Sequence, residues 1–209
     1  MSYRYFHITY NNIKMRNILL FIFFLSLCSC NTTHYFTENS SQTSGIDFSK
    51  GKWLLGDIEA DAEIKEEITK VSLNDFSEHL KNRITYYLDN KSLLIPQKIN
   101  LKPNRTTILD LKKGTNYDFY INIKCEDERN DLTNFNVIDH AYYKKQMTFA
   151  RVTIEVYDLN KGEITYSQSI IGSIDEFSSV TFKPKHKVIM GCYKKLITQI
   201  NKKSIKNTN

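Results

Sequence analysis

Residues 149–166, FARVTIEVYDLNKGEITY, contain two alternating runs separated by a short polar turn. Apolar side chains recur at every second position of the first run, at Ala150, Val152, Ile154 and Val156. The polar positions between them are Arg151, Thr153 and Glu155. The turn is Asn160-Lys161-Gly162, and the second run continues through Ile164, Tyr166, Ile170 and Ile174. This pattern predicts a β-hairpin with one buried face, so that Ile154 lies in the core and Glu155 in solvent.

Three shorter strands are predicted ahead of the hairpin, at 52–59, 93–95 and 117–125. The last of them alternates, with Tyr117, Phe119, Ile121, Ile123 and Cys125 on one face. The polar stretch 126–147 between this strand and the hairpin has no clear period and predicts a loop.

Helical spacing appears in three segments. Ser72 followed by Asp75 suits a helix N-terminus, and apolar residues then recur three and four apart at Leu73, Phe76, Leu80, Ile84 and Leu88. A brief helix is predicted over 106–113, ending at Gly114. A closing helix after Pro184 has a stripe of Val188, Ile189, Cys192, Leu196 and Ile200.

The resulting order is β-α-β-(α)-β-β-β-α. It predicts an α+β fold with a single mixed sheet of about five strands and two main helices packed on it. This domain is expected over 52–203, followed by a disordered tail at 204–209.

Two segments carry a family resemblance. Thr115-Asn116-Tyr117-Asp118-Phe119-Tyr120-Ile121 resembles the "gaDyvi" strand of the TolB N-terminal-like domains. Residues 151–158 followed by Lys161-Gly162-Glu163-Ile164 resemble the "lyD..tGeil" hairpin of the same family. Relatives include lipoprotein activators of penicillin-binding proteins and the periplasmic part of the curli secretion lipoprotein. The long loop at 126–147 and the lack of a glycine after the third strand depart from the family pattern. The resemblance implies an α+β docking module for envelope machinery, without catalysis of its own.

An export signal precedes this domain. The run 18–27, ILLFIFFLSL, is uncharged and follows Lys14 and Arg16. It is too short to cross a bilayer, which takes roughly 20 apolar residues, and fits the core of a signal peptide. Its end, Leu27-Cys28-Ser29-Cys30, resembles a bacterial lipobox in which Cys30 is the lipidated residue. Cys28 is the poorer candidate, because bulky Leu27 would precede the cleavage site.

These features predict the organisation of the N-terminal part. Residues 1–29 are expected to be the signal peptide, with Met15 as an alternative start. Residues 30–51 are expected to be the lipidated cysteine and a flexible tether, because 31–49 are rich in Ser, Thr and Asn. The protein is therefore expected on the outer membrane, lipid-anchored by palmitate-type chains and facing the periplasm.

The formal charge of +6 is unevenly distributed. Eight lysines and no acid lie in 177–209, whereas 31–176 contain 18 bases and 23 acids. An acidic body in an exported protein argues against nucleic-acid binding. The basic helix is either a solvated face or an interaction surface for an anionic partner, formed by Lys187, Lys194, Lys195, Lys202 and Lys203.

Cys125 and Cys192 remain after signal-peptide removal. An exported protein can pair them in a disulfide, but both also suit small buried core positions.

The sequence gives little indication of catalysis. The histidines of the mature chain, at 34, 79, 140 and 186, form no ligand pair, so no metal or other cofactor is expected. Glu126, Asp127 and Glu128 suit a solvated turn better than a general acid/base pair. We therefore expect a non-enzymatic interaction module with an unidentified envelope protein as partner. The alternative is a small hydrolase or ligand binder that uses loop 126–147, where Asp139 adjoins His140.

Overall fold

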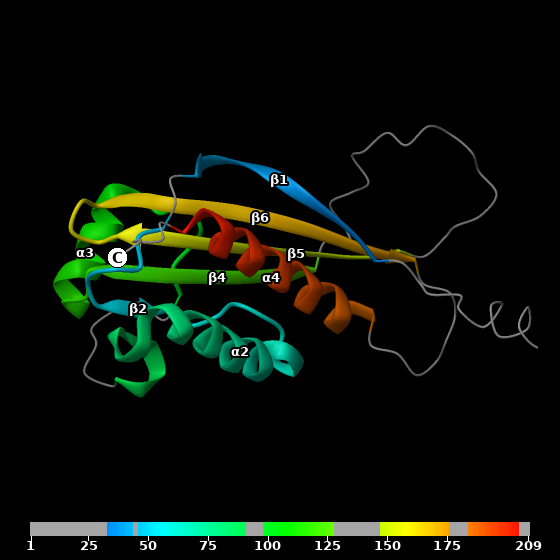
Figure 1. Cartoon of the computed structure of the whole chain (residues 1–209), viewed down its shortest axis with the longest axis horizontal. Helices are drawn as coiled ribbons and strands as arrows, with labels where there is room; N and C mark the ends of the chain where they lie inside the picture. The colour runs from blue at the N-terminus through cyan, green and yellow to red at the C-terminus, as the bar shows by residue number, and fades with distance from the viewer. Residues whose placement is uncertain (1–32, 44–45, 91–97, 128–146, 176–183, 205–209) are drawn as a thin grey trace, which may run out of the picture. The chain divides into compact units, whose positions relative to one another are not determined.

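The computed structural model describes residues 33–43, 46–90, 98–127, 147–175 and 184–204. They form a six-stranded sheet in the order β1-β6-β5-β4-β2-β3 (Figure 1). The strands are β1 (Thr33–Thr43), β2 (Trp53–Leu55), β3 (Ile84–Tyr86), β4 (Phe119–Asp127), β5 (Met147–Asp158) and β6 (Glu163–Asp175). The helices are α2 (Ala62–Leu80), α3 (Arg105–Thr115) and α4 (Pro184–Lys203), with short 3-10 turns η1 (Lys81–Arg83) and η2 (Tyr87–Asp89).

The sheet is mixed. β2 runs parallel to both of its neighbours, β3 and β4, while the other pairs are antiparallel. From β2 onward the elements follow the predicted order, so the α+β class with a single mixed sheet is confirmed.

The β5–β6 hairpin forms as predicted. Gly162 takes the left-handed conformation (φ +69°) that closes the turn, and Asp158 Oδ1 accepts the N–H groups of Asn160 and Lys161, each at 3.0 Å. A bulge follows, because Val156 pairs with Tyr166 while Tyr157 pairs with Ile164. Ile164 and Tyr166 therefore pack into different clusters, although the alternation had placed them in one run.

The larger hydrophobic core lies between the sheet and helices α2 and α4. The inward residues of β5 and the predicted stripe of α4 are all buried there, including Ile154 and Cys192 at 0% exposure. This part of the helix and strand pattern is confirmed.

Helix α2 starts ten residues earlier than Ser72, the residue that resembled its cap. Its buried stripe repeats every four residues, at Ile64, Ile68, Ser72, Phe76 and Leu80. Ser72 is a small side chain in the middle of this stripe, so a cap at that position is wrong. Ile84 belongs to β3 and Leu88 to η2. The strand expected at 93–95 lies outside the described residues.

A second, smaller core covers part of the other sheet face. Helix α3 contributes Ile108 and Leu111 to it. The other buried members are Leu54, Ile99, Tyr120, Tyr157 and Leu159. The helix is capped by Asn104, whose side chain accepts the Thr107 N–H at 2.9 Å. It ends at Asn116 in the left-handed conformation (φ +57°) rather than at Gly114.

Asp118 joins three elements beside this second core. It accepts the Lys52 backbone N–H at 2.9 Å, Lys112 Nζ at 2.9 Å and Asn160 Nδ2 at 3.1 Å. These donors, led by the Lys52 backbone N–H, lower the pKa of Asp118 to about 2. The carboxylate therefore fastens the start of β2 and the end of α3 to the hairpin turn.

The prediction of a flexible tether over residues 30–51 is wrong for much of that segment. Residues 33–43 form edge strand β1, which pairs antiparallel with β6 from Thr33↔Ile174 to Thr43↔Tyr166. Ile46 and Phe48 are buried in the larger core. The compact unit therefore begins at Thr33 rather than at residue 52. Backbone pairing holds an edge strand without an alternating apolar pattern, and Tyr35 of β1 packs against the core.

Candidate functional site

The predicted lipidation site, Cys30, lies outside the described residues together with Cys28 and the apolar run. None of the helices that the structure describes is long and apolar enough to cross a bilayer. Cys30 therefore stays a prediction from sequence.

The five lysines of the predicted interaction surface are all exposed on α4. The segment lacks acids in sequence, but Asp61, directly before α2, and Glu67 of α2 lie beside it. Lys185 pairs with Asp61, and His186 Nε2 lies 2.6 Å from Glu67. Lys195 Nζ sits 5.5 Å from the centre of the Tyr35 ring. The structure thus places the lysines on one helix whose N-terminal turn lies against the start of α2.

Cys125 and Cys192 are buried and unbridged. Burial first, and then the neighbouring Cys192, raise the pKa of the Cys125 thiol to about 12. Cys192 Sγ donates to the Ala150 carbonyl at 3.7 Å. Here both residues are separate thiols packed within the core.

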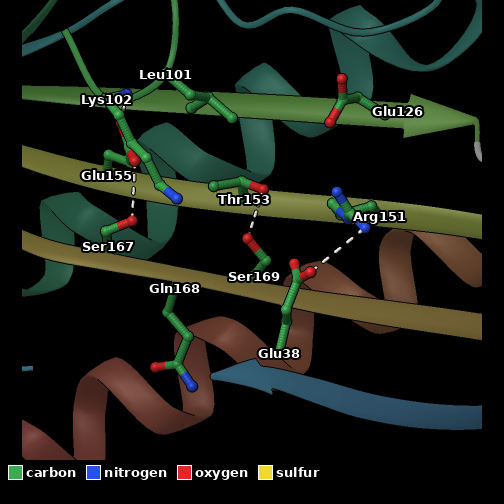
Figure 2. Close-up of a pocket in the computed structure, with 10 residues that line it drawn as sticks. All are labelled: Glu38, Leu101, Lys102, Glu126, Arg151, Thr153, Glu155, Ser167, Gln168 and Ser169. Carbon is green, nitrogen blue, oxygen red and sulfur yellow. Dashed lines mark hydrogen bonds and ion pairs between the residues drawn. The ribbon is translucent and has the colours of Figure 1, made fainter. Parts of the chain in front are cut away.

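A polar pocket of about 230 Å³ opens on the sheet face opposite α2 and α4. Figure 2 shows the residues that line it. They are Glu38, Leu101, Lys102, Glu126, Arg151, Thr153, Glu155, Ser167, Gln168 and Ser169. They come from β1, β4, β5, β6 and the segment that precedes α3.

Glu155 is the central buried group of this pocket, at 0% exposure. Its carboxylate accepts the Ser167 hydroxyl, the Tyr157 hydroxyl and the Lys102 backbone N–H, each at 2.8 Å. The prediction that Glu155 faces solvent is therefore wrong, and Thr153, at 2% exposure, is buried as well. The alternation correctly placed both on the face opposite Ile154, but it did not reveal that this face is covered too.

The segment before α3 provides part of that cover. Ile99 accepts a hydrogen bond through its carbonyl from Asn122 Nδ2 at 3.0 Å, and the same amide donates to the Tyr157 hydroxyl at 2.9 Å. Lys102 takes a left-handed conformation (φ +51°), which is uncommon for a residue with a side chain. Its N–H is thereby directed at Glu155, so the segment is fixed by buried polar contacts.

Ion pairs form the rim of the pocket. Arg151 lies 3.5 Å from Glu38, and Lys124 lies 2.5 Å from Glu126 and 3.7 Å from Glu59. The hydrogen bond to Glu126 is the main reason that the pKa of Lys124 is raised. Between the two pairs, the Thr153 and Ser169 hydroxyls are 2.8 Å apart. The arrangement offers alternating charges and hydroxyls to a polar ligand.

A catalytic arrangement would require a base that is available to a nucleophile or to substrate. Glu155 instead accepts three hydrogen bonds from groups of the protein itself. Of the alternative site at 126–147, Glu126 lines the pocket, whereas Asp139 and His140 lie outside the described residues. Within the described ranges, no group of three His, Cys, Asp or Glu side chains could hold a metal ion. His79, for example, contacts Asn201 at 2.9 Å and stacks on Phe48.

Most pocket residues were not predicted from sequence as a site. One signal was present, because Ser167 and Ser169 alternate in β6 and place hydroxyls on one face. No comparable pattern marks Glu38 or Lys102, which reach the pocket only through β1 pairing and the path of the segment before α3.

No family model matches the chain, and no curated protein matches it. Among solved structures, it aligns with the PelC dodecamer from Paraburkholderia phytofirmans at 10% identity and a TM-score of 0.43, covering 84% of this chain and 100% of that chain. The hypothetical protein CT253 from Chlamydia trachomatis aligns at 14% identity and a TM-score of 0.40, covering 74% and 95%. Lipoprotein GNA1162 from Neisseria meningitidis aligns at 13% identity and a TM-score of 0.36, covering 73% and 99%. At these identities and TM-scores the alignments establish no shared function, and the resemblance to TolB N-terminal-like domains is not confirmed.

Proposed function

We propose that this protein is a lipoprotein of the bacterial cell envelope that acts as a non-catalytic accessory module. The observation that carries the proposal is Leu27-Cys28-Ser29-Cys30, at the end of a short apolar run and directly ahead of a folded domain that begins at Thr33. Acyl chains on Cys30 would bury many methylenes, each contributing about 0.8 kcal/mol, and so anchor the domain without a membrane-spanning helix.

The bonding on the polar sheet face supports a non-enzymatic role. Glu155 directs its oxygens at protein donors, and the rim charges are held in ion pairs. Such a network fixes the positions of strands and loops more readily than it moves protons. The partner would be an envelope protein in the periplasm, with the anchor in the outer membrane and the α4 lysines as a candidate contact surface. Nucleic acid is not expected as a partner.

Replacing the anchor residue tests the proposal. Cys30→Ala should lose labelling by palmitate analogues and either leave the membrane fraction or accumulate as a precursor. Cys28→Ala is the matched control and should keep both label and location. Labelling that survives Cys30→Ala, or that is lost in Cys28→Ala, would refute the assignment of Cys30. Crosslinking in intact envelopes, followed by capture of this protein, would then identify the partner.

A second candidate is a binding protein for a small polar ligand, favoured by the pocket beside Arg151 and Ser169. In this case Arg151→Gln should abolish the rise in melting temperature that a panel of sugars and amino acids produces. A panel without any such rise would count against this candidate.

A further inference from the structure

The chain between the predicted lipid anchor and the folded domain is very short. β1 starts at Thr33, three residues after Cys30. A chain extends by at most about 3.6 Å per residue, so the two Cα atoms are no more than about 11 Å apart. Lipidation of Cys30 would therefore hold the start of β1 close to the bilayer, in contrast to the long tether that the composition of this segment indicates.

The start of β1 defines which end of the sheet lies nearest to the lipid. Thr33 pairs with Ile174, close to the end of β6, and Thr148 of β5 pairs with the same residue. Figure 1 shows β1 beginning where β6 ends and β5 begins. The hairpin turn and α3 lie at the opposite end of the sheet (Figure 1).

An exposed aromatic residue lies at this anchor-proximal end. Phe36 is 62% exposed, and along a strand it lies only about 10 Å from Thr33. Two residues further along β1, Glu38 pairs with Arg151 of β5, whose backbone is level with Phe36 because both residues pair with Ile171. The other large exposed hydrophobic among the described residues is Leu88, at 56%. It follows β3, which lies five strand positions from β1, or about 24 Å across the sheet.

We propose that the anchor-proximal end of β1 rests on the lipid bilayer, with Phe36 in the interfacial layer and the Glu38–Arg151 pair at its aqueous border. The proposal rests on lipidation of Cys30, as proposed above. Aromatic side chains favour this layer, and a second apolar contact strengthens an acyl anchor. We favour the bilayer over a protein partner, because the short chain between Cys30 and Thr33 would hold Phe36 near the membrane surface whether or not a partner is present.

The test uses tryptophan fluorescence of the full lipidated protein in phosphatidylcholine vesicles with brominated acyl chains. The native Trp53 is fully buried and provides a constant background. Phe36→Trp should be quenched roughly twofold more than the unsubstituted protein, because an indole at the interface lies near the bromine atoms. Leu88→Trp is the matched control at the far edge and should be quenched no more than the background.

Vesicle flotation separates failure of the anchor from failure of the orientation. Protein that does not float refutes lipidation, and with it this inference. Protein that floats while Phe36→Trp is quenched no more than Leu88→Trp refutes the orientation alone. Fluorescence of Phe36→Trp that responds to protein concentration but not to brominated lipid would assign the surface to contacts between copies, and would also overturn the proposal.

Discussion

At the scale of single residues, two carboxylates illustrate how the same side-chain chemistry serves different purposes in this fold. Glu155 is fully buried and held by three neutral donors, whereas Asp118 is partly exposed and joins a backbone N–H, a lysine and an amide. Each fastens segments that are far apart in sequence, so each should be more sensitive to substitution than a surface acid.

Reversing the charge at Glu155 should strongly destabilise the domain. Glu155→Lys leaves the donors of Ser167, Tyr157 and Lys102 without their acceptor and buries an ammonium group. We expect the free energy of unfolding to fall by at least about 3 kcal/mol. Urea unfolding monitored by circular dichroism would measure this. Glu163→Lys on the exposed start of β6 should change stability by less than about 0.5 kcal/mol, and similar losses in both variants would contradict the buried network.

Asp118 should contribute a stability that disappears in acid. Because its pKa is lowered to about 2 from an ordinary value of 3.8, the contribution is present above the ordinary value and is lost as the pH falls towards 2. With a discount for partial exposure, we expect about 1–2 kcal/mol. We would measure the free energy of unfolding in urea at pH 5 and at pH 2. Between these values it should fall by about that much more in the parent than in Asp118→Asn. Parallel pH profiles would show that the contacts of Asp118 are not energetically important.

At the scale of elements, the packing of α4 on β6 depends on a close approach at Gly172. A Cβ atom at this position would lie 2.6 Å from Val188 Cγ1 and 2.7 Å from Cys192 Sγ. Both neighbours are short, buried side chains that cannot swing away. The helix therefore sits as close to the strand as it does because position 172 has no side chain.

Gly172→Ala should lift α4 from the sheet and destabilise the domain by about 1–3 kcal/mol, because it overpacks a close contact. Val188→Ala alone should also destabilise, by leaving a cavity. In the double variant the smaller residue 188 makes room for the new methyl group, so the combined loss in urea unfolding should be less than the sum of the two single losses. If the two losses of stability simply add, residues 172 and 188 do not contact one another.

At the scale of the whole molecule, the folded unit begins with an edge strand that is joined almost directly to the predicted anchor. β1 covers the edge of β6 and places Tyr35 beside α4. Residues 33–43 are therefore part of the domain as well as its link to the predicted anchor.

Removing β1 should consequently weaken the fold. A non-lipidated variant that begins at Thr33 should be stable, whereas one that begins at Ile46 loses the β1–β6 hydrogen bonds and at least about 2 kcal/mol of stability. It should also self-associate, since β6 becomes an unprotected edge. Urea unfolding and size-exclusion chromatography would measure both effects. Two variants of equal stability and size would mean that residues 33–43 act as a tether after all.

The local pattern was sufficient for the hairpin at 149–175 and for the closing helix. Alternation identifies the face of β5 that meets the helices, and the stripe from Val188 to Ile200 identifies the face of α4 that meets the sheet, because each element buries one continuous face. The predicted lipobox is also a local sequence pattern, and it stays a prediction. The same pattern wrongly predicted that Glu155 is exposed, because a polar residue at the alternate positions of a strand normally faces water.

Only the tertiary structure determined that the sheet face opposite α2 and α4 is partly covered. The segment before α3 brings Lys102 and Ile99 over it, and their backbone groups bond to Glu155 and Asn122, contacts between residues 53 and 23 positions apart in sequence. It likewise decided that 33–43 pair with β6. Edge pairing is made by backbone groups that every residue carries, so it leaves no trace in the order of side chains.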